Sequence, residues 1–132
     1  MSALKVALLL FVFSPLSACG ESLPASVEIT REKQPSLQST LSVGQHLILL
    51  TAPAPVTAYH WEARIPAESV VALASPPRYV GGGGIPGGLQ RTRFELLAKE
   101  AGRVEINFYL LPGADTSASS AVDRFVLQLG VR

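Results

Sequence analysis

The chain has 132 residues, 11 of them basic and 10 acidic, so its formal net charge at pH 7 is only +1. This balance excludes the basic footprint of a nucleic-acid-binding protein and a polybasic patch for membrane lipids. Its single cysteine, Cys19, excludes an internal disulfide, and the roughly one hundred residues after the N-terminal segment suffice for one domain with its own core.

Residues 1–18 have the features of a secretory signal peptide, because Lys5 precedes an apolar run over residues 6–13 and small residues follow. The run is much shorter than the roughly 20 residues of a membrane-spanning helix. The letters LSAC, ending at Cys19, resemble a bacterial lipobox, in which the cysteine carries lipid; an ordinary signal peptide is the alternative. We expect an exported lipoprotein anchored to the membrane through Cys19. Since Gly20 and not aspartate follows, the expected location is the outer membrane, facing the periplasm.

The mature chain divides into a polar tether, residues 19–26, and a domain, residues 27–132. Alternating apolar and polar positions predict strands within residues 27–31, 37–50, 59–65, 91–97, 103–110 and 124–132. Residues 68–75 and 96–102 are the only stretches with helical character, and both are short. Seven or eight short strands predict an all-β, immunoglobulin-like sandwich without a disulfide.

Prolines are expected to interrupt this strand pattern in two places. The segment APAPV, residues 52–56, should stop any strand, and Pro76 and Pro77 should end the strand-like stretch that precedes them.

The glycine-rich segment Gly81–Gly88 contains a formal GxGxxG pattern at Gly82, Gly84 and Gly87. Pro86 and the strand-like residues after it argue against the helix that a nucleotide site needs, so we interpret the segment as a surface loop suited to backbone contact. The two histidines, His46 and His60, form no cluster with metal-ligand spacing, and no GxSxG elbow is present. We expect no catalytic residue, metal or cofactor.

Several segments, taken in order, resemble the chagasin-type inhibitors of papain-like cysteine proteases: LSVGQHLILL, APVTAYHW, the glycine segment, AGRVEINFYLLPG and RFVLQLGV. The resemblance covers residues 27–132. It implies an immunoglobulin-like sandwich with three loops at one end, which enter the protease cleft without covalent chemistry. The usual loop signatures of the family are NPTTGYxW, GxGG and RPW.

The resemblance implies that these residues contact a protease: Pro55, Val56, Thr57, Ala58, Gly81, Gly82, Gly83, Gly84, Leu111, Pro112 and Gly113. Gly87 and Gly88 are the alternative equivalents of the second signature. Tyr59 and Trp61 lie two apart on an entering strand, so they share a face and are expected to anchor the tip to the core, with His60 facing solvent.

The loops also depart from the family pattern. Leu111 and Gly113 stand where arginine and tryptophan are usual, and these are typical interface hot spots. Ala58 replaces a glycine and should disfavour a positive φ. Nearby Arg78, Tyr79, Arg91 and Arg93 either supply compensating charge and aromatic surface or are ordinary solvated strand ends.

Two functions therefore compete. The first is a lipid-anchored inhibitor that reversibly occludes the cleft of a papain-like cysteine protease. The alternative is a non-inhibitory envelope lipoprotein that uses the same sandwich end to bind another protein. An enzyme is not expected, for want of a nucleophile, base or metal site.

Overall fold

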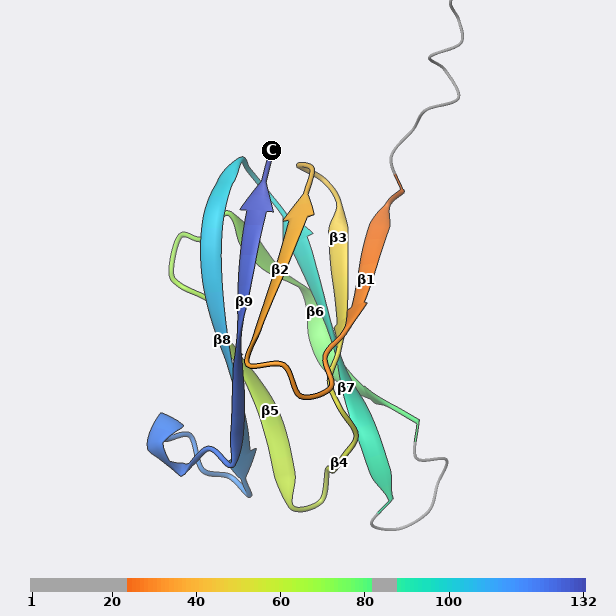
Figure 1. Ribbon diagram of the computed structural model, residues 1–132, viewed down its shortest axis with the longest axis vertical. Helices are drawn as coiled ribbons and strands as arrows, with labels where there is room; N and C mark the ends of the chain where they lie inside the picture. Colours follow the sequence, from red (N-terminus) through yellow and green to blue (C-terminus); the bar gives the residue numbers. More distant parts are fainter. Residues whose placement is uncertain (1–23, 82–87) are drawn as a thin grey trace, which may run out of the picture.

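A computed structural model describes residues 24–81 and 88–132, and the predicted sites at Cys19 and Gly82–Gly84 lie outside these ranges. The described residues form nine strands and one short 3-10 helix (Figure 1). The elements are β1 (Ser26–Thr30), β2 (Ser36–Leu41), β3 (His46–Leu50), β4 (Ala54–Pro55), β5 (Tyr59–Arg64), β6 (Val71–Val80), β7 (Leu89–Ala98), β8 (Gly102–Pro112), η2 (Ala118–Ser120) and β9 (Asp123–Val131). Within these ranges no helix has the length and apolar character that a transmembrane helix needs.

The strands form two sheets that pack face to face. The five-stranded sheet has the order β1-β3-β7-β4, with β6 also paired to β7, and the four-stranded sheet has the order β2-β9-β8-β5. β1 pairs in parallel with β3, and β2 pairs in parallel with β9. The chain therefore changes sheets between β1 and β2, as Figure 1 shows. The predicted all-β, immunoglobulin-like sandwich is confirmed.

The core lies between the sheets and follows the predicted alternation along β8 and β9. Ile106 and Phe108 are fully buried, and their cross-strand neighbours on β9, Leu127 and Phe125, are buried beside them. Phe108 stacks on Phe125 with ring centroids 4.5 Å apart, and it meets Phe94 of β7 edge-on at 5.1 Å. The aromatic contacts thus join the two sheets without a disulfide.

The strands extend further than the prolines suggested. β4 forms within residues 52–56 and pairs with β7, which raises the strand count in the described residues to nine. β6 runs through Pro76 and Pro77, where the register shifts between Ser75 and Arg78. Proline cannot donate to a ladder, but β6 is an edge strand and the bulge takes both prolines out of the pairing.

The chain bonds to the domain just before β1. The Gln45 side chain donates to the Pro24 carbonyl at 2.7 Å, and the His46 N–H donates to the Ala25 carbonyl at 2.9 Å. Among the described residues, Pro24 is thus the first that is hydrogen-bonded to the domain, and it lies within the predicted tether.

Candidate functional site

Three segments far apart in the sequence meet at the end of the sandwich opposite the start of β1 (Figure 1). They are the turn between β4 and β5, the adjoining ends of β6 and β7, and the end of β8. We call the described residues here, 54–58, 81, 88–89 and 112–114, the tip. The tip unites the described parts of all three predicted loops.

Backbone hydrogen bonds hold the first and third segments together. The Ala58 N–H donates to the Pro55 carbonyl at 3.1 Å, which closes the turn between β4 and β5. The Gly113 N–H then donates to the Ala58 carbonyl at 2.8 Å, directly beyond the paired residues Tyr59 and Pro112. The turn is therefore fixed to the end of β8.

The first segment is also paired with the second. Ala54 lies opposite Gln90 and Pro55 lies opposite Leu89 in an antiparallel ladder. The Gln90 side chain donates to the Gly81 carbonyl at 2.8 Å, across the ends of β6 and β7. Because β4 belongs to one sheet and β5 to the other, the turn between them spans both layers of the sandwich.

The described residues of the tip have mostly small side chains, and none of these side chains is ionisable. Thr57, Ala58 and Gly113 are exposed, while Val56 is half-buried. Leu89 has the largest exposed side chain of the tip, with 57% of its surface open to solvent. This surface therefore offers apolar contact, backbone hydrogen bonding and the hydroxyl of Thr57.

Ala58 has no positive φ, in agreement with the expectation that alanine disfavours one. Among the described non-glycine residues only Glu68 has a positive φ, so Ala58 occupies ordinary backbone space. The positive φ at the tip belongs instead to glycines, at +83° in Gly81 and +56° in Gly113. Alanine at position 58 is therefore compatible with the backbone conformation of the turn.

The side chain of Leu111, one of the residues predicted to contact a protease, is fully buried and so has no surface open to a partner. The connection between β8 and β9 folds back over the outer face of the four-stranded sheet. Arg64 of β5 donates to the Thr116 carbonyl, and Arg124 of β9 donates to the Ala118 carbonyl at 3.4 Å. β8 lies between β5 and β9, so this connection covers Leu111.

Tyr59 and Trp61 lie on the inner face of β5. Trp61 is only 7% exposed and meets the ring of Phe125 edge-on, with centroids 5.2 Å apart. Tyr59 is partly buried and packs against the same core. His60 lies on the outer face opposite Leu111 and is half-buried, so its exposure is smaller than expected.

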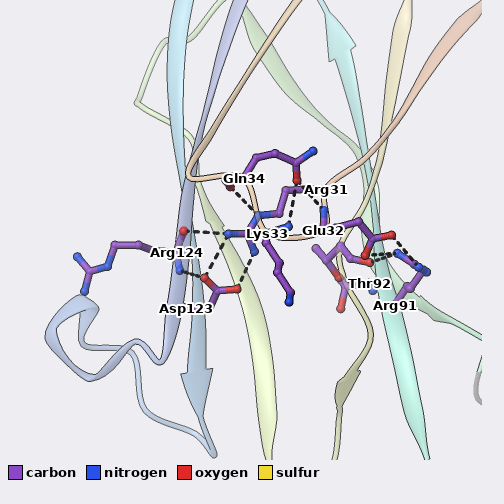
Figure 2. Close-up of polar contacts among 9 residues, drawn as sticks. Arg31, Glu32, Lys33, Gln34, Arg91, Thr92, Asp123 and Arg124 are labelled. Carbon is purple, nitrogen blue, oxygen red and sulfur yellow. Dashed lines mark hydrogen bonds and ion pairs between the residues drawn. The ribbon is translucent and has the colours of Figure 1, made fainter.

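The connection between β1 and β2 makes polar contacts with both sheets (Figure 2). Arg31 is 2% exposed, and its guanidinium bonds both carboxylate oxygens of Asp123 on β9, at 2.6 and 3.2 Å. The same group lies 4.6 Å from the ring centroid of Phe125 and 5.7 Å from that of Trp61. The buried cation is thus paired and flanked by aromatic faces.

Opposing effects act on the Asp123 carboxyl. Partial burial raises its pKa, whereas hydrogen bonds from the Arg31 side chain and the Arg124 backbone, together with the charge of Arg31, lower it. The net result is a pKa below the usual value, so the carboxylate stays ionised and holds Arg31.

Glu32, next to Arg31, reaches the other sheet. Its carboxylate pairs with Arg91 of β7 at 3.1 Å, and Arg91 also donates to the Thr51 carbonyl at 2.9 Å. Arg93 pairs with Glu95 at 3.2 Å. Arg91 and Arg93 are thus engaged in ion pairs on the sheet face, whereas Arg78 and Tyr79 are exposed. Four residues were considered as compensation for the missing arginine and tryptophan of the family. Of these, only Arg78 and Tyr79 have exposed side chains near the tip.

Neither the position of Leu89 nor the pair of Arg31 with Asp123 was predicted from the sequence. A signal for Arg31 existed, because the alternation of Val27 and Ile29 continues to position 31 and places an arginine on an inward face. No local pattern placed Leu89 at the tip, because its position there comes from lying opposite Pro55. In the described parts of the chain, no group of three or more histidine, cysteine, aspartate or glutamate side chains is arranged to hold a metal ion.

No protein-family model matches the chain, and comparison with curated protein sequences finds no relative. Solved structures do share the fold. The cysteine protease inhibitor EhICP2 from Entamoeba histolytica superposes with a TM-score of 0.59 at 13% identity, over 83% of this chain and 99% of that one. Amebosin gives 0.58 at 16% identity, with the same coverage of both chains.

PbICP-C, solved in complex with falcipain-2, gives a TM-score of 0.52 at 16% identity, over 83% of this chain and all of that one. The predicted resemblance to chagasin-type inhibitors is therefore confirmed at the level of the fold.

Proposed function

We propose that this protein is a lipid-anchored inhibitor that reversibly occludes the active-site cleft of papain-like cysteine proteases. The observation that carries the proposal is the meeting of the described parts of the three predicted loop segments at one end, where the hydrogen bond from Gly113 to Ala58 joins the first and the third. The shared fold with EhICP2, a cysteine protease inhibitor, and with PbICP-C, solved in complex with falcipain-2, supports it.

In the proposed mechanism the inhibitor fills the protease cleft and takes part in no covalent step. The tip offers small side chains and backbone groups held by ladder pairing, so little conformational entropy is lost on binding. Such a surface fills a cleft by shape and apolar contact. Inhibition should be competitive with substrate, fully reversible, and free of cleavage of the inhibitor.

The inhibition test uses purified protein without residues 1–19, titrated against papain and cathepsin L with a small peptide substrate. The bound protein should shield the enzyme's catalytic cysteine from iodoacetamide, and dilution should restore full activity. Absence of inhibition at high micromolar concentration would contradict the proposal. Slow cleavage of the protein by the enzyme would mark it as a substrate instead.

The anchoring half of the proposal rests on the lipobox-like residues that end at Cys19. The position of β1 supports it, because its start lies at the opposite end of the sandwich from the tip (Figure 1). A lipid there would leave the tip directed away from the membrane, into the periplasm. Palmitate labelling of the full chain, with Cys19→Ser as control, tests this half independently of inhibition.

A further inference from the structure

Of the large apolar side chains that are exposed in the described residues, Leu89 is the one that lies at the tip. It is 57% exposed and is the first residue of β7. Further along β7 the side chains alternate between the two faces of the sheet, and Thr92 and Phe94 are buried on the inner face. Leu89 therefore projects from the outer face of the five-stranded sheet.

The ladder places Leu89 beside the turn between β4 and β5. Its cross-strand partner is Pro55, and cross-strand neighbours on one face have Cβ atoms about 5 Å apart. Val56 follows Pro55 directly and is half-buried. The apolar residues of the turn thus lie directly beside Leu89.

The backbone under this surface is fixed on both sides. Ala54 pairs with Gln90, and the Gln90 side chain is bonded to the Gly81 carbonyl. Arg91, the next outward residue of β7, is bonded to Glu32 and to the Thr51 carbonyl, so its charge is already compensated. A partner that covers Leu89 meets an ordered, apolar surface with no free charge among these residues.

The side of the tip at the end of β8 has fewer side chains available for contact. Leu111 is buried beneath the connection between β8 and β9, and Gly113 has no side chain. Gly113 instead holds the turn through its N–H bond to Ala58. The end of β8 therefore supports the tip, while side chains available for contact gather on the β7 side.

We infer that the contact surface of this protein extends from Pro55 and Val56 onto Leu89, which packs against an uncharged, apolar wall beside the protease cleft. This inference rests on the proposed function and names a specificity-determining residue within it. A protease whose matching wall carries a charge would be inhibited poorly, because that charge would lose water without gaining a partner.

The test compares Leu89→Asp with Val43→Asp, each lacking residues 1–19 and assayed against papain and cathepsin L. Val43 is a matched control because it is 52% exposed on the turn between β2 and β3, at the other end of the sandwich. Leu89→Asp should raise the inhibition constant about tenfold or more, Leu89→Met should leave it within about threefold, and Val43→Asp should leave it unchanged. Thermal unfolding of each variant checks that the fold is intact.

The outcomes separate this inference from the proposed function. Inhibition by the unaltered protein with an unchanged constant for Leu89→Asp overturns the inference and leaves the function standing. No inhibition by the unaltered protein overturns both. A rise of the constant by the same factor for Val43→Asp also overturns the inference, because the effect would then follow the added charge and not the position.

Discussion

The N–H of Gly113 donates a hydrogen bond to the carbonyl of Ala58 at 2.8 Å, and so ties the end of β8 to the turn between β4 and β5. Gly113 makes this bond with a φ of +56°, in the left-handed region. Family resemblance places a tryptophan at this position, but the backbone here has a conformation that favours glycine.

Gly113→Ala should therefore lower the free energy of unfolding by about 1–2 kcal/mol, since L-residues are strained at this φ. It should also weaken inhibition, because the turn loses its support. Gly130→Ala is the matched control, because Gly130 has no positive φ and a Cβ there meets nothing within 4 Å. Urea titration followed by Trp61 fluorescence measures both variants. Equal destabilisation by the two would show that the φ of Gly113 is not the cause.

Leu111→Arg, which restores the family residue, should not restore a protease contact. The side chain is fully buried, so the variant should lose at least as much stability as Leu111→Ala, for which about 2–4 kcal/mol is expected. Val122→Arg, on the same connection but 57% exposed, should change stability by less than about 0.5 kcal/mol. Tighter protease binding by Leu111→Arg with normal stability would contradict the burial of this residue.

Substitutions at Thr57 and Tyr59 should distinguish a loss of protease binding from a loss of folding stability. Thr57 is exposed at the turn, so Thr57→Asp should weaken inhibition and leave the free energy of unfolding within about 0.5 kcal/mol of its normal value. Tyr59 packs against the core, so Tyr59→Ala should lower that free energy by about 2 kcal/mol. Inhibition titrations and urea unfolding on both variants make the comparison. The assignment of tip and anchor fails if Thr57→Asp is the more destabilising change.

Asp123→Ala should lower the free energy of unfolding by about 2 kcal/mol, because it leaves the buried Arg31 guanidinium without its counter-charge. The value is set below that of a fully buried pair, since the Asp123 side chain is 41% exposed and water screens it. Asp123→Asn, which keeps an acceptor oxygen, should cost less. Urea unfolding near neutral pH checks the order of the two variants.

The same carboxylate gives a pH dependence. Its pKa is lower in the folded protein than in the unfolded chain, so its contribution is fully present above the unfolded value, near 3.8. The contribution is lost as the pH falls through the folded value. Stability measured from neutral pH down to about 3 should decline less steeply for Asp123→Asn than for the unaltered protein. Parallel curves would exclude this role for Asp123.

The sequence predicted the class of fold because strand alternation is a local property. Each apolar side chain of the pattern in β8 and β9 lies where a period of two places it. The shared inner face of Tyr59 and Trp61 followed from the same spacing. The prediction that the prolines stop the strands was wrong. The effect of a proline depends on whether its strand lies at a sheet edge, which no local pattern records.

By itself, then, the sequence determined the all-β sandwich, the order of its loops and the anchoring of the turn by two aromatic residues. The tertiary structure decided which loop residues are available. Leu111 is buried because residues after β8 fold back over it, and Arg31 is paired because β9 brings Asp123 beside it. Leu89 lies at the tip because it is paired with Pro55. Coverage, ion pairing and register all depend on segments distant in the chain, so no single stretch of sequence specifies them.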